Sequence, residues 1–501
     1  MSADYILAID QGTTNTKGLL VGRRGQPVFR TSVPVKVSSP RAGWVEQDAV
    51  ELWKSVVAVV RECLAWTAQN HGSVDGVAIS NQRETVVAWQ RTTSTPVAPA
   101  ILWQCRRSAA ICEQLAADHR EPMLRERTGL GVDPLFSASK IQWLLENVSG
   151  LPEQASAGDV CFGTIDSWLI WMLTEGKEHA CDVSNASRTQ LLNLESADWD
   201  EELLALFEVP RAVLPTVKMS SGVFGECSGI EGLRGVPIVS AMGDSHAAMA
   251  GHACFSPGSV KATYGTGSSL MTLLPRLPRL REKSKLATTI AWGLPIADVQ
   301  YALEGNVSMT GSAVQWVGEF LGLGDPVNDA VALAGTVKDS GGVYFVPAML
   351  GLGAPYWDSV ARGTVTGLGR TSRAGHLALA ALEAIAFQVR DVLTAMVEES
   401  GCNLPALHVD GGATRNDALM QFQADIIGRP VVRSGHEDLS ALGTAWFGGL
   451  TLGWWSTLAD LVELQPEADT FYPRMQTAEA EARYAEWKLA VQRARLREVQ
   501  A

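Results

Sequence analysis

The first stretch that could do chemistry is a polar turn near the N-terminus. In YILAIDQGTTNTKGLLV (5–21) an apolar run ends at Asp10, then Gly12, Thr13 and Thr14 follow before apolar residues resume. A tight turn of this kind presents backbone N–H groups and hydroxyls that can hold a phosphate. Asp10 would repel a bare phosphate, so its presence favours a cation such as Mg²⁺ between the two. A hairpin whose Asp and Thr only satisfy turn amides is the alternative for this stretch alone.

Arg83 and Glu84 form a second candidate site. They directly follow the buried strand predicted over VDGVAIS (74–80), and ligand contacts in α/β proteins lie at such strand ends. An adjacent cation and carboxylate supply donors and acceptors to neighbouring hydroxyl groups, as a polyol requires. Trp103 offers a flat apolar wall for the C–H faces of the same ligand. Taken singly, these positions also fit a surface ion pair and a core tryptophan.

Asp244 is the candidate for acid–base chemistry. It follows the apolar segment VPIVSAM (236–242) and Gly243, and a run of small residues able to begin a helix comes after it. A carboxylate in this place can take the proton from a hydroxyl group as that hydroxyl attacks phosphorus. Helix N-capping is the competing interpretation. For His246, two residues further on, we expect a structural role.

Three glycine-rich stretches place Gly beside Thr, Ser or Asn where a strand ends or a helix begins. They are 261–270, 303–316 and 408–422. The third has the order strand, turn and helix, which is typical of a turn that contacts phosphate or nucleotide. Each pattern is weak by itself, and the triplet GTG at 265–267 lacks the third glycine and the spaced acid of a dinucleotide-binding fingerprint.

These candidate sites depend on strands and helices in alternation. The expected strands are YILAID (5–10), GLLVGRRGQPVFR (18–30), TSVPVKV (31–37), RGVPIVSAM (234–242), GSVKATYG (258–265) and SLMTLL (269–274). Apolar residues at helical spacing predict helices from Gln47 to Asn70 and from Gly375 to Glu399. The chain is therefore assigned to the α/β class.

Composition limits the class of protein. With 501 residues the chain is long enough for two or three domains, and 46% hydrophobic with 19% charged residues is an ordinary globular balance. The net charge of −13 and the lack of a basic run argue against nucleic-acid binding. The eight scattered cysteines have no metal-ligand spacing and are expected to be reduced. Because no signal peptide or membrane-spanning apolar stretch stands out, we expect a cytoplasmic protein without membrane contact.

Two distant segments of the chain echo each other. IDQGTTNTKGLL near the start and VDGGATRNDALM near residue 410 both place an apolar strand before Asp-x-Gly-x-Thr. Two lobes built from related halves would produce this pattern, with a boundary within 245–260. A single match of this length is also compatible with chance.

Taken together, the ordered motifs resemble the FGGY family of carbohydrate kinases, and within it the glycerol kinases. They span nearly the whole chain: IDQGTT, SNQRET, WQCRR, TGLGVDPLFSASK, GDSHAA, YGTGS, ALEG, GSAVQW, PYWD, RGTVTGL, VDGGATRN and LMQFQADI. The resemblance implies two ribonuclease-H-like (actin-like ATPase) lobes flanking a catalytic cleft. We expect an N-terminal lobe over 1–250 with the phosphate hairpin and polyol-binding residues, and a nucleotide-binding C-terminal lobe over 251–501.

The same resemblance implies an activity and roles for particular residues. The chain would phosphorylate a primary hydroxyl of a small polyol or sugar with ATP and Mg²⁺, glycerol being the first expected acceptor, and a homodimer or homotetramer would fit the family. Asp10 would lie near the metal ion and Asp244 would be the base. The expected polyol contacts are Arg83, Glu84, Trp103 and Asp244. The expected nucleotide contacts are Thr13, Thr14, Asn15, Lys17, Thr266, Gly311, Gln315, Gly412 and Asn416.

Two substrate-site positions depart from the glycerol kinase pattern. Leu135 stands where glycerol kinases have Tyr, and Ser245 follows the expected base where they have Gln. Each change removes a polar group, which weakens glycerol binding by roughly 0.5–1.5 kcal/mol unless water or a larger substrate fills the gap. A kinase for a four- or five-carbon polyol or ketose, such as erythritol, erythrulose, xylulose or ribulose, is therefore the alternative. A non-catalytic sugar and ATP sensor is a further alternative, against which the retained Asp10, Asp244 and phosphate turn argue.

Overall fold

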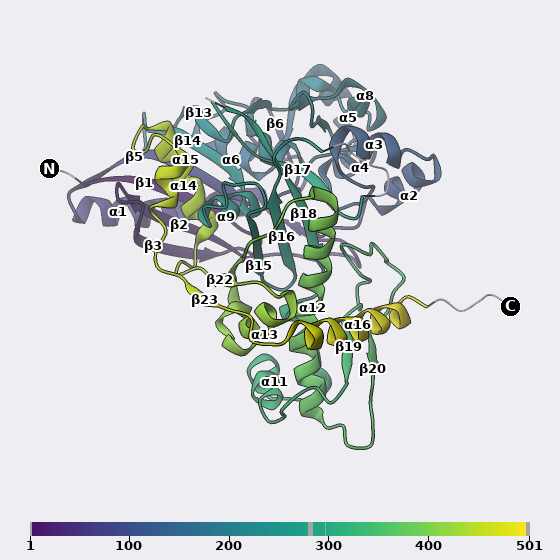
Figure 1. The fold of residues 1–501 in the computed structure, drawn as a ribbon. Coiled ribbons are helices and arrows are strands. Elements are labelled where there is room, and N and C mark those ends of the chain that lie inside the picture. The colour runs from purple at the N-terminus through teal and green to yellow at the C-terminus, as the bar shows by residue number, and fades with distance from the viewer. Residues whose placement is uncertain (1–2, 279–283, 296, 497–501) are drawn as a thin grey trace.

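Two large β-sheets organise the molecule. The computed structural model describes residues 3–278, 284–295 and 297–496. The first sheet has the strand order β13-β14-β5-β1-β2-β3 and the second has the order β17-β18-β16-β15-β21-β22-β23. Figure 1 shows the first sheet in the upper part of the molecule and the long helix α12 (Ala374–Ser400) extending below the second sheet. The α/β assignment is confirmed.

The first sheet is buried on both faces, which explains the continuous apolar run at its centre. Its strands are β1 (Ala3–Gln11), β2 (Asn15–Gly22), β3 (Pro27–Pro34), β5 (Gly72–Asn81), β13 (Ser221–Glu226) and β14 (Pro237–Gly243). Alternate residues of β1 point to opposite faces. Leu7 and Ile9 join the core under helix α1 (Ala49–Gln69), whereas Ile6 and Ala8 join the core under helix α14 (Leu439–Thr451).

The second sheet repeats the topology of the first. Its strands are β15 (Val260–Tyr264), β16 (Ser268–Leu273), β17 (Ala287–Leu294), β18 (Ala297–Val307), β21 (Leu407–Asp410), β22 (Val431–Arg433) and β23 (Asp469–Phe471). Strands β15, β16 and β18 pair antiparallel, as β1, β2 and β3 do. Strand β21 then pairs parallel with β15 and with β22, as β5 does with β1 and β14. The predicted pair of related lobes follows from this correspondence.

The similarity between the two Asp-x-Gly-x-Thr segments, however, pairs two turns that are not equivalent in the fold. Asp10 lies in β1, which leads into a hairpin, whereas Asp410 ends β21, the counterpart of β5. The hairpin that corresponds to residues 12–14 is the turn 265–267 between β15 and β16. A five-residue pattern of Asp, Gly and Thr is too short to identify which strand precedes it.

Most of the expected elements are present, with one strand boundary misplaced. The expected strand 18–30 is two strands, because β2 ends at Gly22 and Gly25, with a φ of 76°, lies in the turn before β3. The expected helices coincide with α1 and α12. The strand, turn and helix near residue 410 are β21, η2 (Gly412–Arg415) and α13 (Asp417–Ile427).

Smaller elements complete the two halves. The remaining helices are α2 (Ala109–Ala117), α3 (Glu121–Thr128), α4 (Ser137–Asn147), α5 (Leu151–Ala157), α6 (Ile165–Leu173), α7 (Val183–Ala186), α8 (Glu201–Leu206), η1 (Arg211–Val213), α9 (Asp244–Gly251), α10 (Gly311–Phe320), α11 (Pro326–Ala334), α15 (Leu458–Val462) and α16 (Thr477–Ala494). The short strands are β4 (Glu46–Gln47), β6 (Val87–Gln90), β7 (Ala100–Ile101), β8 (Val160–Gly163), β9 (Ala180–Asp182), β10 (Leu192–Asn193), β11 (Asp198–Trp199), β12 (Thr216–Lys218), β19 (Tyr344–Val346) and β20 (Thr364–Thr366). All eight cysteines are free thiols, as expected.

Helices α9 and α14 meet between the two sheets at very short range. A Cβ atom on Gly443 would lie 1.9 Å from the carbonyl oxygen of Ala247, and one on Gly251 would lie 2.4 Å from that of Leu439. Glycine is required at both places because the helix backbones touch. Since α14 comes from the second half of the chain but packs on the first sheet, the division at residues 250 and 251 stays a prediction.

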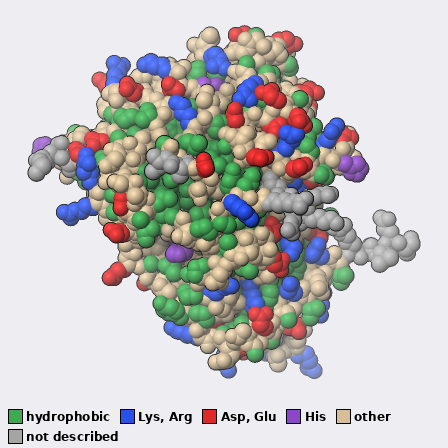
Figure 2. Space-filling model, turned by 45° about the horizontal axis from the view of Figure 1, so that its top comes forward, with side chains coloured by type: hydrophobic (Ala, Val, Ile, Leu, Met, Phe, Trp, Pro, Cys, Tyr) green, Lys and Arg blue, Asp and Glu red, His purple; other side chains and the backbone are tan. Residues whose placement is uncertain are grey.

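The surface carries charges of both signs. Figure 2 shows Lys and Arg side chains interspersed with Asp and Glu over the visible face, while hydrophobic side chains gather near the centre of the view. Among the described residues, no helix is both long and apolar enough to cross a membrane.

Candidate active site

The carboxyl ends of three parallel strands bring the first-lobe candidates together. Gln11 of β1 pairs with Asn81 of β5, which pairs in turn with Gly243 of β14. Asp10, Arg83 and Asp244 therefore emerge at one edge of the sheet. Strand geometry alone explains why residues more than 200 positions apart share a site.

The hairpin after β1 is pinned from several sides. The Gly12 N–H donates to the Asn15 carbonyl oxygen at 2.9 Å, and Asn15 Nδ2 donates to Thr14 Oγ1 at 3.1 Å. Trp103 Nε1 donates to Thr13 Oγ1 at 3.0 Å, and the Trp103 side chain is 36% exposed. Trp103 is therefore not a plain core residue, because it also links the hairpin to Thr85, two residues after Arg83, whose Oγ1 accepts from the Trp103 N–H at 3.2 Å.

Asp10 and Lys17 are the charged residues beside this hairpin. Asp10 is 9% exposed and accepts a hydrogen bond from Ser80 Oγ at 3.0 Å. Burial raises the pKa of Asp10, and the opposing charge of Lys17 only reduces that rise. Lys17 Nζ donates to Asp438 Oδ1 at 2.9 Å. Burial lowers the pKa of Lys17, but Asp10 and Asp438 outweigh it, so its pKa is raised.

A chain of alternating charges lies under the expected polyol site. Arg83 Nε donates to Asp244 Oδ1 at 3.1 Å, and Arg83 Nη1 lies 2.7 Å from Glu304 Oε1. Glu304 Oε2 lies 2.7 Å from Arg188 Nη2, and Arg188 Nε donates to Glu84 Oε1 at 2.8 Å. The side chains of Glu304 and Arg188 are 0% and 1% exposed. All the charged residues expected to hold the polyol are therefore joined in one network, which is buried except at Asp244.

The electrostatics of this network favour the charged forms of Arg83 and Glu304. Burial lowers the pKa of Arg83, but the carboxylates of Glu304 and Glu84 raise it more, so the pKa lies above its usual range. Burial raises the pKa of Glu304, but Arg188 and Arg83 outweigh it and hold the pKa well below its usual range. Such a network is stable only while its charges balance.

Asp244 is the first residue of α9, and Gly243 occupies the N-cap position without a side-chain cap. Asp244 Oδ1 accepts hydrogen bonds from Arg83 and from the Ser245 N–H. Its side chain is 39% exposed, and among the described residues no hydrogen bond reaches Oδ2. Asp244 is therefore not the N-cap residue, although its Oδ1 accepts from one first-turn N–H, and its other carboxylate oxygen is available to a ligand.

Leu135 and Glu84 are held by a common buried amine. Glu84 has a φ of 60°, and its carbonyl oxygen accepts from Ser137 Oγ and Lys140 Nζ, both at 3.1 Å. Lys140 Nζ also donates to the Leu135 carbonyl oxygen, and burial lowers the pKa of Lys140 to about 8. The Leu135 side chain offers no polar group, and it packs against the apolar cluster that contains Phe136.

Ser245 faces the second sheet. Its Oγ donates to Ser269 Oγ at 3.2 Å, and Ser269 Oγ donates to Glu304 Oε1 at 3.1 Å. The hydroxyl of Ser245 thus takes part in a contact between the lobes. His246, for which a structural role is expected, is fully buried, with Nε2 3.3 Å from Thr289 Oγ1.

The second-lobe candidates surround the end of the parallel pair β15 and β21. The Gly311 N–H donates to the Gly265 carbonyl oxygen at 3.0 Å, which places the start of α10 against the turn that carries the exposed Thr266. Gln315 is exposed one turn into α10. Asn416 caps α13 by accepting from the Leu419 N–H. The five expected contacts thus come from the turn, α10 and the segment after β21, with Gly412 in the last.

Alanine substitutions at Gly411 and Gly412 are expected to have very different effects on stability. Gly411 has a φ of 97°, and a Cβ there would lie 2.4 Å from the Tyr264 carbonyl oxygen, whereas a Cβ on Gly412 meets nothing within 4 Å. We expect Gly411→Ala to lower the free energy of unfolding by about 2–4 kcal/mol. Gly412→Ala should leave thermal unfolding unchanged. Equal melting temperatures for the two variants would contradict this account of the turn.

Several site residues were not identified from the sequence. Glu304 lies in the ALEG segment, but nothing in that segment marks its carboxylate as functional. Arg188 and Lys140 sit in stretches without any catalytic pattern, and Asp438 resembles an ordinary residue before a helix. Among the described residues, no group of three or more His, Cys, Asp or Glu side chains could hold a metal ion by itself.

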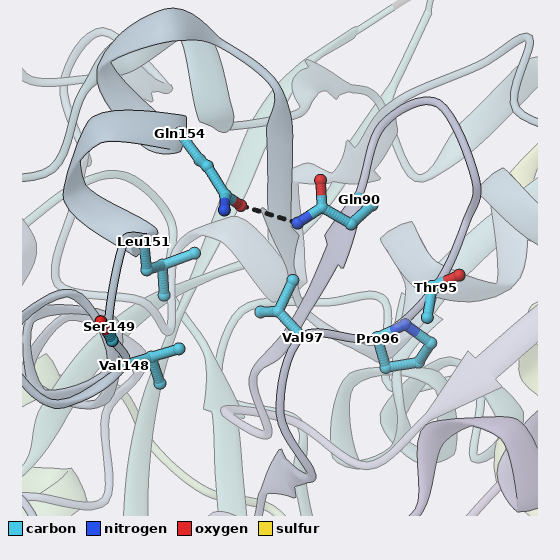
Figure 3. A pocket seen from close by; sticks show the side chains of 8 residues that line it. All are labelled: Gln90, Thr95, Pro96, Val97, Val148, Ser149, Leu151 and Gln154. Atoms are coloured by element: carbon cyan, nitrogen blue, oxygen red, sulfur yellow. Dashed lines mark hydrogen bonds between the residues drawn. The ribbon is translucent and has the colours of Figure 1, made fainter.

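A separate surface hollow lies in the first lobe. Figure 3 shows Gln90 and Gln154 facing each other across its rim, where Gln90 Nε2 donates to Gln154 Oε1 at 2.7 Å, with Val97 and Val148 below them. Its volume is about 310 Å³. None of the candidate site residues lines this hollow, so it is not part of the site described above.

The repeated sheet topology, with an acidic strand end and glycine-rich turns, defines a two-lobed phosphotransferase of the actin-like ATPase fold. The N-terminal domain model of the FGGY carbohydrate kinases matches residues 5–251, and the C-terminal domain model matches residues 260–452. The chain belongs to the FGGY family of carbohydrate kinases. Its members transfer a phosphoryl group to a carbohydrate hydroxyl, and this chain is a kinase of that kind.

Individual relatives agree with this assignment. The chain is 47% identical to the glycerol kinase of Symbiobacterium thermophilum over 497 residues, covering 99% of both chains. It is 44% identical to glycerol kinase 2 of Thermotoga maritima, covering 98% of both. The crystal structure of Plasmodium falciparum glycerol kinase with ADP superposes with a TM-score of 0.91, at 30% identity and 99% coverage of both chains.

Proposed function

We propose that this protein transfers the γ-phosphoryl group of ATP to a primary hydroxyl of glycerol, giving glycerol 3-phosphate and ADP. The observation that carries the proposal is the contact of Arg83 Nε with Asp244 Oδ1 at 3.1 Å, beside the hairpin that follows β1. This contact sets a hydroxyl-binding cation against a carboxylate with a free oxygen. The high identity to glycerol kinases over the full chain supports glycerol as the acceptor.

In this proposal Asp244 is the general base. Arg83 holds Oδ1, so Oδ2 can accept the proton of the attacking hydroxyl as the new P–O bond forms. Glu84 accepts from a second hydroxyl, and Arg83 donates to an acceptor oxygen. Trp103, fixed by its bond to Thr13, covers the carbon face of the acceptor.

The nucleotide is proposed to lie between the two hairpins. Thr13, Thr14, Asn15 and Lys17 would bind its phosphates from the first lobe. The second lobe would contribute Thr266, Gly311, Gln315, Gly412 and Asn416. The open space above Gly412 and the exposure of Thr266 support this placement. Closure around the nucleotide would exclude water and so prevent hydrolysis.

Asp10 fits a magnesium ion. Protein sites for Mg²⁺ use one or two carboxylates, with phosphate oxygens and water completing the coordination. The pKa of Asp10 is raised by burial first and by Asp244 among its neighbours, so a cation here would offset two nearby negative charges. When bound, Mg²⁺ would neutralise charge on the phosphates.

Leu135 and Ser245 keep a second acceptor class under consideration. Leu135 packs into an apolar cluster, and the Ser245 hydroxyl is bonded to Ser269, so neither is set to bind a glycerol hydroxyl. A four- or five-carbon polyol or ketose could use the space that smaller side chains leave. The choice of glycerol as the acceptor is supported by the relatives, whereas the longer acceptors are supported by these two side chains.

An ADP-release assay decides between these acceptors. The purified chain is given ATP and Mg²⁺ with glycerol, dihydroxyacetone, erythritol, erythrulose, xylulose or ribulose. We expect glycerol to show the highest kcat/KM. A longer acceptor clearly above glycerol would overturn the glycerol assignment, and no release with any acceptor would favour the binding-only sensor.

Restoring the polar groups should improve glycerol binding. We expect Leu135→Tyr and Ser245→Gln each to lower the KM for glycerol by roughly 2- to 10-fold, because each adds one hydrogen-bonding group. The same Leu→Tyr change at Leu377, half-buried in α12 of the second lobe, serves as the control. An unchanged or higher KM in both site variants would show that water or protein already fills these places.

Two further properties are proposed on family grounds alone. We expect the enzyme to act in the cytoplasm, where ATP is available, and to assemble as a homodimer or homotetramer. Mass measurement in solution tests the assembly.

A further inference from the structure

We propose that Glu304 is a positioning residue that completes the acceptor site from the second lobe and links acceptor binding to nucleotide binding. This inference rests on the proposed function, because it assumes that a polyol binds at Arg83, Glu84 and Asp244. Those three residues belong to the first lobe. Glu304 lies on β18, an interior strand of the second sheet.

One carboxylate orients two guanidinium groups. Glu304 Oε1 lies 2.7 Å from Arg83 Nη1, and Glu304 Oε2 lies 2.7 Å from Arg188 Nη2. A guanidinium is planar and rigid, so fixing one edge fixes the direction of the other N–H groups. The N–H groups whose direction is fixed in this way are the two Nε groups, which donate to Asp244 and Glu84. Glu304 therefore sets the direction of both first-lobe contacts without touching the acceptor.

The same strands carry the expected nucleotide contacts. Strand β18 pairs with β16, which begins directly after the turn containing Thr266, and β18 leads within a few residues to Gly311 at the start of α10. Ser269 on β16 adds a hydrogen bond to Glu304 and another from Ser245. A shift of the second lobe that accompanies nucleotide binding would therefore move Glu304 and Ser269 as well.

The charge balance makes this contact consequential. Without Glu304, Arg83 and Arg188 would be two buried cations at one junction, with only Asp244 and Glu84 to balance them. Among the described residues, Arg83 Nη1 and Arg188 Nη1 have no hydrogen-bond partner, and Arg83 Nη1 meets Glu304 only as an ion pair. Removing one partner of a buried ion pair destabilises a protein far more than removing one partner of a surface ion pair. The acceptor site is thus well ordered only while the second lobe supplies its carboxylate.

The variant Glu304→Gln tests the inference because it keeps shape and removes charge. We expect the KM for glycerol to rise roughly 10- to 100-fold, while the Kd for a non-hydrolysable ATP analogue measured without glycerol changes by less than about 3-fold. The diagnostic measurement is the Kd for glycerol by calorimetry, with and without a non-hydrolysable ATP analogue. In the wild type the analogue should tighten glycerol binding, and in the variant the ratio of the two Kd values should fall towards one.

Two further variants keep the test decisive. Asp200→Asn removes a buried carboxylate that holds Arg127 at 2.7 Å in the first lobe, away from the site, and should leave the ratio unchanged. If Glu304→Gln does not fold, Glu304→Asp keeps the charge but shortens its reach and should show the same loss in weaker form. A folded Glu304 variant with wild-type KM and wild-type Kd ratio would overturn the inference. Absence of wild-type turnover would instead count against the proposed function.

Discussion

Replacing Asp244 by Asn is expected to lower kcat roughly 10²- to 10⁴-fold, the usual contribution of a general base. The amide keeps the size of the side chain and can still accept from Arg83, but it cannot take a proton from the acceptor. The KM for the acceptor should change by less than about 5-fold, since the ground-state contact to Arg83 persists as a neutral hydrogen bond. Steady-state ADP release over a range of glycerol concentrations measures both quantities.

A matched control separates loss of the base from loss of a helix-terminal charge. Asp325 stands at the N-terminus of α11 and accepts from the Asn328 N–H, so Asp325→Asn makes the same chemical change at a helix start in the second lobe. We expect it to leave kcat unchanged. A kcat within a few-fold of wild type for Asp244→Asn would remove Asp244 from the chemical step, whereas unchanged glycerol binding with lost turnover would exclude a binding-only sensor.

The placement of candidate residues at one edge of the first sheet was predictable, because local sequence patterns determine where its strands end. Asp10, Arg83 and Asp244 each follow an apolar run that reads as a buried strand, and parallel strands place their carboxyl ends side by side. The register then places these residues at one edge of the sheet, where Arg83 contacts Asp244. For the same reason the glycine-rich turns of the second lobe could be placed at strand ends.

The partners that complete the site could not be predicted in the same way. Glu304, Arg188 and Asp438 reach the site from segments more than 100 residues away from Arg83 or Lys17. Their roles depend on how distant segments of the chain pack together, which no periodicity records. The mismatch of the Asp10 and Asp410 turns has the same cause, since strand order within a sheet is a long-range property.

Arg83 shows why those long-range partners matter for function. Its Nε donates a hydrogen bond to Asp244 Oδ1, and its Nη1 forms an ion pair with Glu304 Oε1 at 2.7 Å. Lysine offers a single ammonium group at the end of a flexible chain, and it cannot hold two carboxylates with the same fixed geometry. We therefore expect Arg83→Lys to lower kcat/KM for the acceptor roughly 10²- to 10³-fold, although the positive charge remains.

The separate changes in kcat and KM identify why Arg83→Lys loses activity. Because Arg83 is expected to bind the acceptor and to orient Asp244, both a higher KM and a lower kcat should appear, whereas Asp244→Asn changes mainly kcat. Arg127, which joins Asp200 at 2.7 Å and Glu202 at 2.6 Å, allows a matched control, since Arg127→Lys also leaves one ammonium between two carboxylates. We expect that control to keep wild-type kcat/KM. A similar kcat/KM for both lysine variants would mean that charge alone, without the forked geometry that joins Asp244 to Glu304, is sufficient at Arg83.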